Sequence, residues 1–110
     1  MTTLSVVIPV FRSAESLPEL LAELARVLPT IAEAYEVVMV DDASPDVSWR
    51  VIQELAAQYP FLRGMQLMRN YGQHNALLCG IRAARYELIV TMDDDLQHPP
   101  DQIPVLLAEL

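Results

Sequence analysis

Residues 86–92, Tyr-Glu-Leu-Ile-Val-Thr-Met, form an apolar run that stops at three consecutive aspartates, Asp93-Asp94-Asp95. Such a run predicts a strand, and its abrupt polar end predicts ligand-binding groups at the strand's carboxyl end. Runs of the same kind occupy residues 4–10, 35–40 and 61–68. Continuous apolar strands are typical of a parallel sheet that is covered on both faces.

Helical segments separate these runs, because apolar residues recur there at helical spacing. Helices are predicted over residues 14–28, 44–59, 73–84 and 101–110. Ser44 or Asp46 is the expected N-cap of the second helix. The alternation predicts an α/β fold with three layers around a mostly parallel sheet. Residues 1–110 read as one unit, and the last helix stops without a cap, so we expect a chain truncated at its C-terminus.

The bulk composition excludes several classes of protein. Hydrophobic residues make up 53% of the 110, which argues against disorder. The net charge is −8 and the seven basic residues are scattered, so no nucleic-acid surface is expected. No stretch approaches the roughly 20 apolar residues of a membrane span, so the chain is expected to be soluble. The single cysteine, Cys79, forbids an internal disulfide and is expected to be a buried thiol in a reducing compartment.

Polar side chains follow three of the predicted strands where each one ends. Asp41-Asp42, Arg69-Asn70 and Asp93-Asp94-Asp95 hold these positions. Ligands bind at the carboxyl ends of the strands in open parallel sheets. We therefore expect one site at this edge of the sheet.

The three aspartates predict a divalent cation. Adjacent carboxylates repel one another, and a hard cation with oxygen ligands removes that cost. Alternation along an extended segment pairs Asp93 with Asp95 and turns Asp94 aside. The alternative is a solvated acidic loop.

The remaining polar positions each allow two interpretations. Asp42 could accept a hydrogen bond from a uracil or guanine ring, or could belong to a simple turn. The loop 69–72 precedes a helix N-terminus that favours an anion, or is a plain capped loop. His74 fits a polar helix start better than a metal ligand, His98 fits a loop residue, and Trp49 fits packing better than sugar stacking.

Four stretches together resemble a known family. Residues 7–11 (VIPVF), 40–46 (VDDASPD), 69–74 (RNYGQH) and 92–100 (MDDDLQHPP) are similar to family 2 glycosyltransferases of the GT-A fold. Within that family they are most similar to the polyprenyl-phosphate branch. The resemblance covers essentially the whole chain and implies the nucleotide-sugar-binding half of a Rossmann-like GT-A domain.

The resemblance implies a role for each matching residue. Pro9 and Phe11 would flank the nucleotide base, Val40 would line its pocket, and Asp42 would contact the base. Three residues would lie near the donor: Arg69, Asn70 and Gly72.

The aspartate cluster is implied to serve the phosphates. Asp93 and Asp94 would lie along the ribose and diphosphate of the donor. Asp95, with Gln97 and Asp93, would hold Mg²⁺ or Mn²⁺, and Asp95 is the expected catalytic residue.

The chain departs from the family pattern at several positions. Arg12-Ser13 stand where Asn-Glu is frequent, Asp94 stands where a small residue is more typical, and Ala43 stands where Gly is frequent. The contact usually made by the Glu is therefore in question, while the metal site is retained.

The implied function is metal-dependent, inverting transfer of a sugar from a UDP-sugar, or less readily a GDP-sugar, to a polyprenyl phosphate. The full-length protein would then work at the cytoplasmic face of a membrane, and the isolated chain would be inactive. Two alternatives stay open: a polysaccharide or glycan acceptor, and a non-catalytic nucleotide-binding module. The sequence also leaves a homo-oligomer open.

Overall fold

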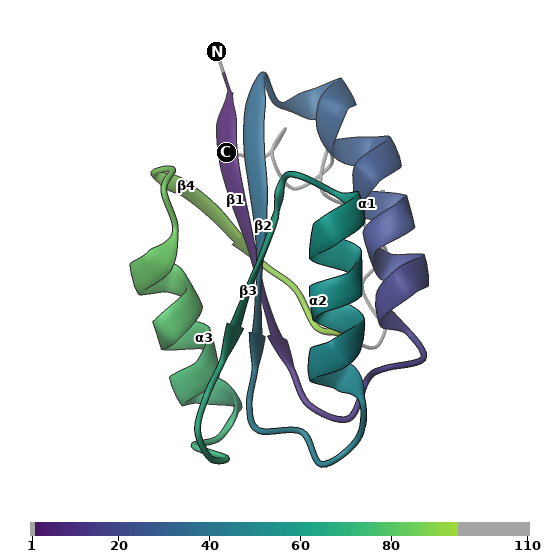
Figure 1. The fold of residues 1–110 in the computed structure, drawn as a ribbon. Coiled ribbons are helices and arrows are strands. Elements are labelled where there is room, and N and C mark those ends of the chain that lie inside the picture. Colours follow the sequence, from purple (N-terminus) through teal and green to yellow (C-terminus); the bar gives the residue numbers. More distant parts are fainter. Residues whose placement is uncertain (1, 95–110) are drawn as a thin grey trace.

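The computed structural model describes residues 2–94, which form a parallel sheet with helices on both faces (Figure 1). The elements in chain order are β1 (Thr3–Val10), α1 (Leu17–Ile31), β2 (Ala34–Asp41), α2 (Ser48–Gln58), β3 (Leu62–Gln66), α3 (Gln73–Ala83) and β4 (Leu88–Thr91). The strands lie in the order β3-β2-β1-β4, and every neighbouring pair is parallel. The predicted α/β class is confirmed, while the predicted helix over 101–110 lies outside the described residues.

The central strand β1 separates two apolar layers. Val6, Ile8 and Val10 belong to the larger core cluster, which includes the buried leucines of α1. Val7 points the other way and packs with Ala76 of α3. Figure 1 shows the same division, with α1 and α2 on one face of the sheet and α3 on the other. Alternate side chains of one strand therefore fill both layers.

Helix α3 approaches the sheet closely at Gly80. A Cβ atom at this position would lie 2.3 Å from Cγ1 of Val7 and 3.1 Å from Cγ2 of Val40. The absent side chain therefore sets the distance between α3 and the central strands.

Helices α1 and α2 have boundaries that differ from the sequence expectation. Helix α1 begins at Leu17 rather than at residue 14, and it continues past Pro29 to Ile31. Pro29 lacks a backbone N–H, but in the last turn of a helix this removes only one hydrogen bond. Helix α2 has Val47 at its N-cap, so the prediction of Ser44 or Asp46 is wrong.

The side chains of these two residues are used nearby instead. Asp46 Oδ1 accepts a hydrogen bond from the Ser48 N–H at 3.0 Å, one residue after the cap. Ser44 turns toward Asp41 and the end of β1, as described below. Competition from these local hydrogen bonds explains why sequence preference misplaced the cap.

The outer strands are shorter and more exposed than expected. β3 was predicted over residues 61–68 and β4 over 86–92, and the prediction that both faces are covered fails for them. Gly64 and Gln66 of β3 are exposed, and no residue of β4 is fully buried. Within residues 2–94 both strands lie at the edges of the sheet, where a strand has only one neighbour.

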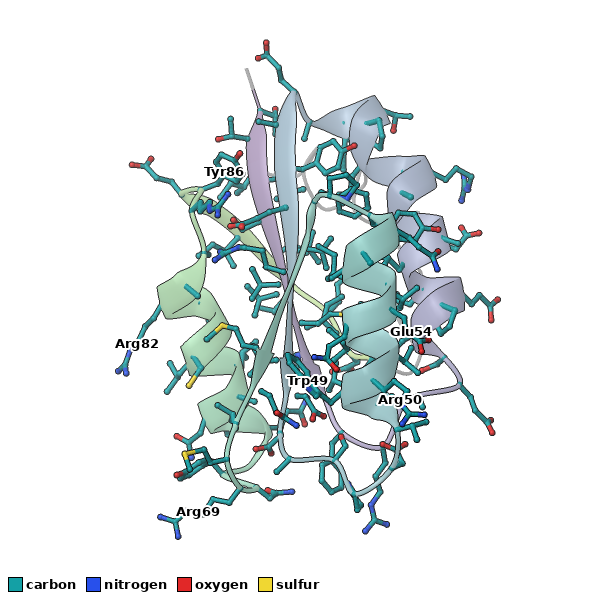
Figure 2. All side chains as sticks on the ribbon, in the orientation of Figure 1. Trp49, Arg50, Glu54, Arg69, Arg82 and Tyr86 are labelled. Atoms are coloured by element: carbon teal, nitrogen blue, oxygen red, sulfur yellow. The ribbon has the colours of Figure 1, made fainter. Side chains whose placement is uncertain are left out.

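Three individual side chains test further expectations. Trp49 packs between α2 and the sheet against the larger core cluster, as predicted (Figure 2). His74 lies exposed in the first turn of α3, which confirms it as a polar residue at a helix start. Cys79 is half-buried rather than buried. It lies on α3 and packs against the smaller cluster.

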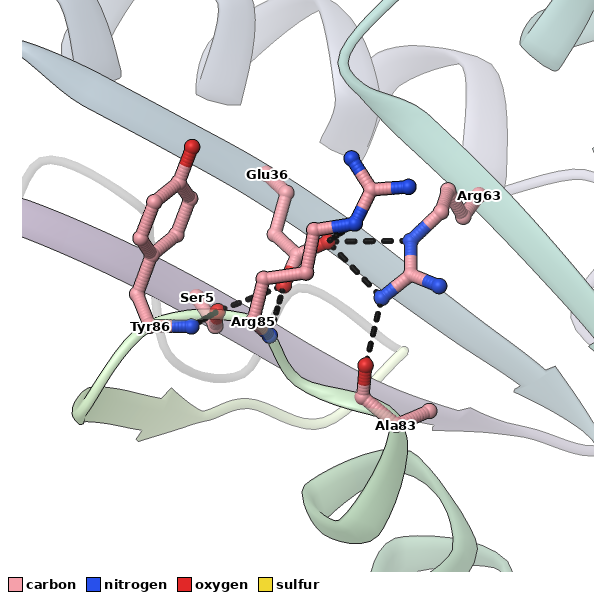
Figure 3. Close-up of polar contacts among 6 residues, drawn as sticks. All are labelled: Ser5, Glu36, Arg63, Ala83, Arg85 and Tyr86. Carbon is pink, nitrogen blue, oxygen red and sulfur yellow. Dashed lines mark hydrogen bonds and ion pairs between the residues drawn. The ribbon is translucent and has the colours of Figure 1, made fainter.

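A charged network ties the sheet to the connection between α3 and β4 (Figure 3). Glu36 is 4% exposed and accepts hydrogen bonds from the Ser5 hydroxyl at 2.7 Å, Arg63 Nε at 2.9 Å and the Arg85 N–H at 2.6 Å. Arg63 also donates to the carbonyl of Ala83 at the end of α3. Burial alone would raise the pKa of Glu36, but these hydrogen bonds outweigh it and lower the pKa.

None of the helices between residues 2 and 94 combines the length and apolar character needed to cross a membrane.

Candidate functional site

A cavity of about 430 Å³ opens at the carboxyl edge of the sheet. Its walls come from the ends of β1 and β2, the loop before α3, and the exit of β4. The lining residues are Pro9, Val10, Phe11, Asp42, Asn70, Gly72, Gln73, Asp93 and Asp94. This is the position at which open parallel sheets bind their ligands. Its volume falls within the roughly 300–1,000 Å³ of small-molecule sites.

Most of the predicted site residues within residues 2–94 meet at this cavity. They are Pro9, Phe11, Asp42, Asn70, Gly72, Asp93 and Asp94. Val10 and Gln73 also line it and were not predicted. Val10 is the last residue of β1, and Gln73 is the first residue of α3, so a rule that counts whole strand ends and helix starts could have found both.

Two predicted residues do not line the cavity. Val40 is fully buried beneath it, in the cluster that packs against α3. Arg69 points outward, with its guanidinium 5.2 Å from the centre of the Tyr71 ring (Figure 2). Strand alternation places Val40 on the α3 face, and no acidic partner of Arg69 draws its side chain inward among the described residues.

Asp42 organises the loop before α3. Its side chain is 3% exposed, and its two carboxylate oxygens accept the N–H groups of Tyr71 at 2.8 Å and Gly72 at 3.0 Å. Gly72 has φ of 95°, a conformation that glycine adopts without strain. Asp42 thus fixes the start of α3 and still lines the cavity.

Asp41, beside it, faces the opposite side of the sheet and is fully buried. Oδ1 accepts the Ser44 hydroxyl at 2.5 Å, whereas Oδ2 has no hydrogen-bond partner in the described part of the chain. Burial raises the pKa of Asp41, the hydrogen bonds from Ser44 oppose that rise, and the nearby carboxylates of Asp46 and Asp42 add to it. Asp41 and Asp42 therefore have separate structural tasks.

Asp94 faces the turn that follows β1. Its Oδ2 accepts the Phe11 N–H at 2.9 Å and the Ser13 hydroxyl at 2.5 Å. Strand alternation predicts that Asp94 turns aside from Asp93, but in the structure both residues line the same cavity. β4 ends at Thr91, so strand alternation no longer governs these residues.

The carboxylates of the cavity suit a cation. Three of the lining residues are aspartates, Asp42, Asp93 and Asp94, and none of the lining residues carries a positive charge. Asp93 Oδ1 accepts a hydrogen bond from the neutral side-chain amide of Gln73, at 3.2 Å. A diphosphate could share this cavity only if a cation offset the repulsion, and oxygen donors of this kind fit Mg²⁺ or Mn²⁺.

The full predicted ligand set extends further along the chain. Asp95 and Gln97, the expected metal ligands with Asp93, lie outside the described residues. Between residues 2 and 94 no group of three His, Cys, Asp or Glu side chains could hold a metal ion. Asp93 is therefore the one predicted metal ligand that the structure places.

Comparison with known proteins agrees with this architecture. Residues 5–110 match the family described as Glycosyl transferase family 2. The undecaprenyl-phosphate 4-deoxy-4-formamido-L-arabinose transferase of Shewanella sediminis is 44% identical over 106 residues, which cover 96% of this chain and 32% of that protein. The transferase of the same name from Klebsiella pneumoniae is 43% identical, with the same coverage. The chain thus spans about a third of the length of these relatives.

Solved structures show the same fold. S. aureus TarS 1–349 superposes with a TM-score of 0.79 at 26% identity, over 97% of this chain and 32% of that one. The mannosyltransferase PcManGT of Pyrobaculum calidifontis, in complex with GDP-Man and Mn²⁺, gives a TM-score of 0.75 at 27% identity, over 84% and 27%. TarS 1–349 in complex with UDP-GlcNAc gives 0.74 at 28% identity, over 86% and 27%. The expected GT-A fold is confirmed, and the chain belongs to glycosyl transferase family 2.

Proposed function

We propose that this chain is the donor-binding part of a metal-dependent, inverting glycosyltransferase that moves a sugar from a UDP-sugar to a polyprenyl phosphate. The observation that carries the proposal is the cavity at the carboxyl edge, where Phe11, Asp42 and Asp93 line one space. A nucleotide base can stack on an aromatic side chain, and a cation held by carboxylates can neutralise the phosphates, so these residue types suit both parts. The names of the relatives support the lipid-phosphate acceptor, and the bound ligands of the solved neighbours support a nucleotide-sugar donor.

Each side of the cavity has its own task in this proposal. Pro9 and Phe11 flank the base, and Asp42 accepts a ring N–H with lone pairs that its two backbone contacts leave available. Asn70 and Gly72 lie beside the donor at the start of α3, where the helix dipole favours an anion. Asp93 lies along the ribose and diphosphate, and Asp94 lines the same side of the cavity while its Oδ2 binds the turn after β1.

Asp93, with Asp95 and Gln97, would hold Mg²⁺ or Mn²⁺. The ion would neutralise charge on the departing nucleoside diphosphate, a contribution of several kcal/mol at order of magnitude. An oxygen of the acceptor phosphate bonds to the anomeric carbon while the bond from that carbon to the diphosphate breaks. Attack from the opposite face inverts the carbon, and an ionised phosphate needs little help from a general base.

The acceptor part of the site would come from the two thirds of the relatives' length that this chain does not cover. Membrane attachment at the cytoplasmic face belongs to that full-length protein. A polysaccharide or glycan acceptor would use the same donor cavity, and two apolar spans in the remaining sequence would favour the lipid acceptor.

Calorimetry tests the donor proposal directly. UDP, GDP and CDP are titrated into the chain with and without Mn²⁺, and the series is repeated on Asp95→Asn. We expect UDP to bind most tightly, only with Mn²⁺, and to weaken by at least about tenfold in Asp95→Asn, since altering even the partners of metal ligands costs about ten- to a hundredfold in metal affinity. Glu54→Gln, which removes one negative charge from an exposed position on α2, is the matched control and should bind as the unaltered chain does. Binding that is independent of metal and unchanged in Asp95→Asn would overturn the proposed role of Asp95.

A further inference from the structure

The turn after β1 is held at three consecutive backbone N–H groups. Phe11 N–H donates to Asp94 Oδ2 at 2.9 Å, Arg12 N–H to Ser44 Oγ at 3.0 Å, and Ser13 N–H to Ser48 Oγ at 3.1 Å. Each acceptor comes from a different segment. The Ser44 and Ser48 contacts lie on the α2 side, so Asp94 alone among the three ties the turn to the exit of β4.

The turn needs such support because its backbone is strained. Arg12 has φ of 54°, in the left-handed region that residues other than Gly, Asn and Asp seldom adopt. Ala43, in the loop that supplies Ser44, is also left-handed with φ of 57°. Left-handed residues of this kind persist when the surrounding contacts determine them.

Asp94 is itself held in place from the turn. The Ser13 hydroxyl donates to Asp94 Oδ2 at 2.5 Å, a closer contact than its 3.1 Å approach to the Phe11 carbonyl. The Ser16 hydroxyl donates to the Asp94 carbonyl at 2.6 Å. The contact is therefore reciprocal: the aspartate caps the turn, and two serines of the turn and the start of α1 fix the backbone and side chain of the aspartate.

The hydrogen bond between Phe11 and Asp94 joins two segments that line different sides of the cavity. Phe11 lines the side assigned to the base, with 39% of its surface exposed to receive a ligand. Asp93, the residue before Asp94, lines the side assigned to the metal. Ser13 is not among the residues that line this cavity.

We propose that Asp94 and Ser13 form a positioning pair, which holds Phe11 in place and couples the base side of the cavity to the metal side. The proposal rests on the proposed function for its ligand, but the contact itself is a property of the ligand-free chain. In this arrangement Asp94 acts on the donor through Phe11, because Oδ2 already binds the turn. A substitution of Ser13 should therefore weaken nucleotide binding, although Ser13 itself does not contact the ligand.

The test compares Ser13→Ala, Asp94→Ala and the double variant, with Ser5→Ala as the matched control. Ser5 also donates its hydroxyl to a carboxylate, that of Glu36 at 2.7 Å, near the opposite end of β1. Exchange of the Phe11 amide hydrogen is measured first, without ligand. The affinity for UDP with Mn²⁺ is then measured by calorimetry.

We expect the Phe11 amide to exchange about tenfold faster in Asp94→Ala and several-fold faster in Ser13→Ala, since this amide is otherwise exposed. UDP affinity should fall about three- to tenfold in both single variants, the effect of one hydrogen bond, and no further in the double variant. Ser5→Ala should change neither quantity. Asp94→Asn should retain part of the affinity, because its amide oxygen can still accept the Phe11 N–H.

Two results would overturn the positioning pair. One is a Phe11 exchange rate that does not respond to Asp94→Ala. The other is a loss of UDP affinity in Asp94→Ala with none in Ser13→Ala, which would make Asp94 a direct ligand contact. Absence of UDP binding in the unaltered chain would overturn the proposed donor function, while the exchange measurement would still decide the pair.

Discussion

Glu36 is one of three buried carboxylates within residues 2–94, and its side chain, 6% exposed, forms an ion pair with Arg63. Removing one member of a buried pair leaves the other uncompensated, and such losses reach about 3–5 kcal/mol. Arg63 is 34% exposed and can recover some hydration, so we expect Glu36→Gln to lower the free energy of unfolding by about 2–3 kcal/mol. Urea unfolding at neutral pH measures this. The matched control is Glu23→Gln, which breaks the exposed Glu23–Arg26 pair and should cost about 0.5 kcal/mol or less. Equal losses in the two variants would contradict the assignment.

Glu36 also predicts a pH dependence with a definite sign. Its pKa is lower in the folded chain than in the unfolded chain, so it contributes stability above its ordinary pKa of 4.5. That stability is lost as the pH falls through the lowered value. We expect the unaltered chain to lose more stability than Glu36→Gln between neutral and acidic pH, measured by urea unfolding at each pH. Asp41, whose pKa is raised, contributes the opposite slope in both proteins and cancels from the difference.

At the scale of the elements, the approach of α3 to the sheet depends on Gly80. An added methyl group would overlap Val7, and overpacking of this kind costs about 1–3 kcal/mol. Alanine favours a helix over glycine by about 1 kcal/mol, which offsets part of that cost. We therefore expect Gly80→Ala to be destabilising by up to about 2 kcal/mol in urea unfolding. Arg82→Ala, at an exposed position on the same helix, should stay within about 0.5 kcal/mol. A stabilised Gly80→Ala would show that helix propensity outweighs the packing.

The sequence predicted the positions of the strands but not the contacts between layers or the exact helix caps. Apolar runs that give way to proline or to polar residues located the four strands, because burial of a parallel sheet imposes that pattern. The same pattern could not reveal that Gly80 meets Val7 across layers, since contacts between layers have no local signature. It also misplaced the N-cap of α2, because the side chains of Asp46 and Ser44 make competing local hydrogen bonds with Ser48 and Asp41.

For the whole molecule, the sequence predicted which edge of the sheet carries the cavity. It did not predict the direction in which individual side chains point. Strand ends placed Pro9, Asp42 and Asp93 in one cavity, as a parallel sheet requires. The outward course of Arg69 and the turn-facing Asp94 depend on irregular backbone after β3 and β4, where no period applies. The resemblance supplied residue roles, but it could not supply the contact between Ser13 and Asp94, because both positions depart from the family pattern.

Alone, the 110-residue chain should bind the donor nucleotide but should not complete the transfer. A donor cavity without an acceptor part should bind nucleotide and leave the sugar untransferred. Ligand that binds only the folded state stabilises it by about 2.7 kcal/mol at a hundred times Kd, so UDP with Mn²⁺ should raise the midpoint of thermal unfolding and EDTA should reverse the rise. ADP with Mn²⁺ is the control, since it offers the same diphosphate on a different base and should stabilise less. Incubation of the chain with a radiolabelled UDP-sugar and polyprenyl phosphate should yield no labelled lipid. Labelled product would place the acceptor site within these 110 residues, because transfer requires both substrates to meet on one surface.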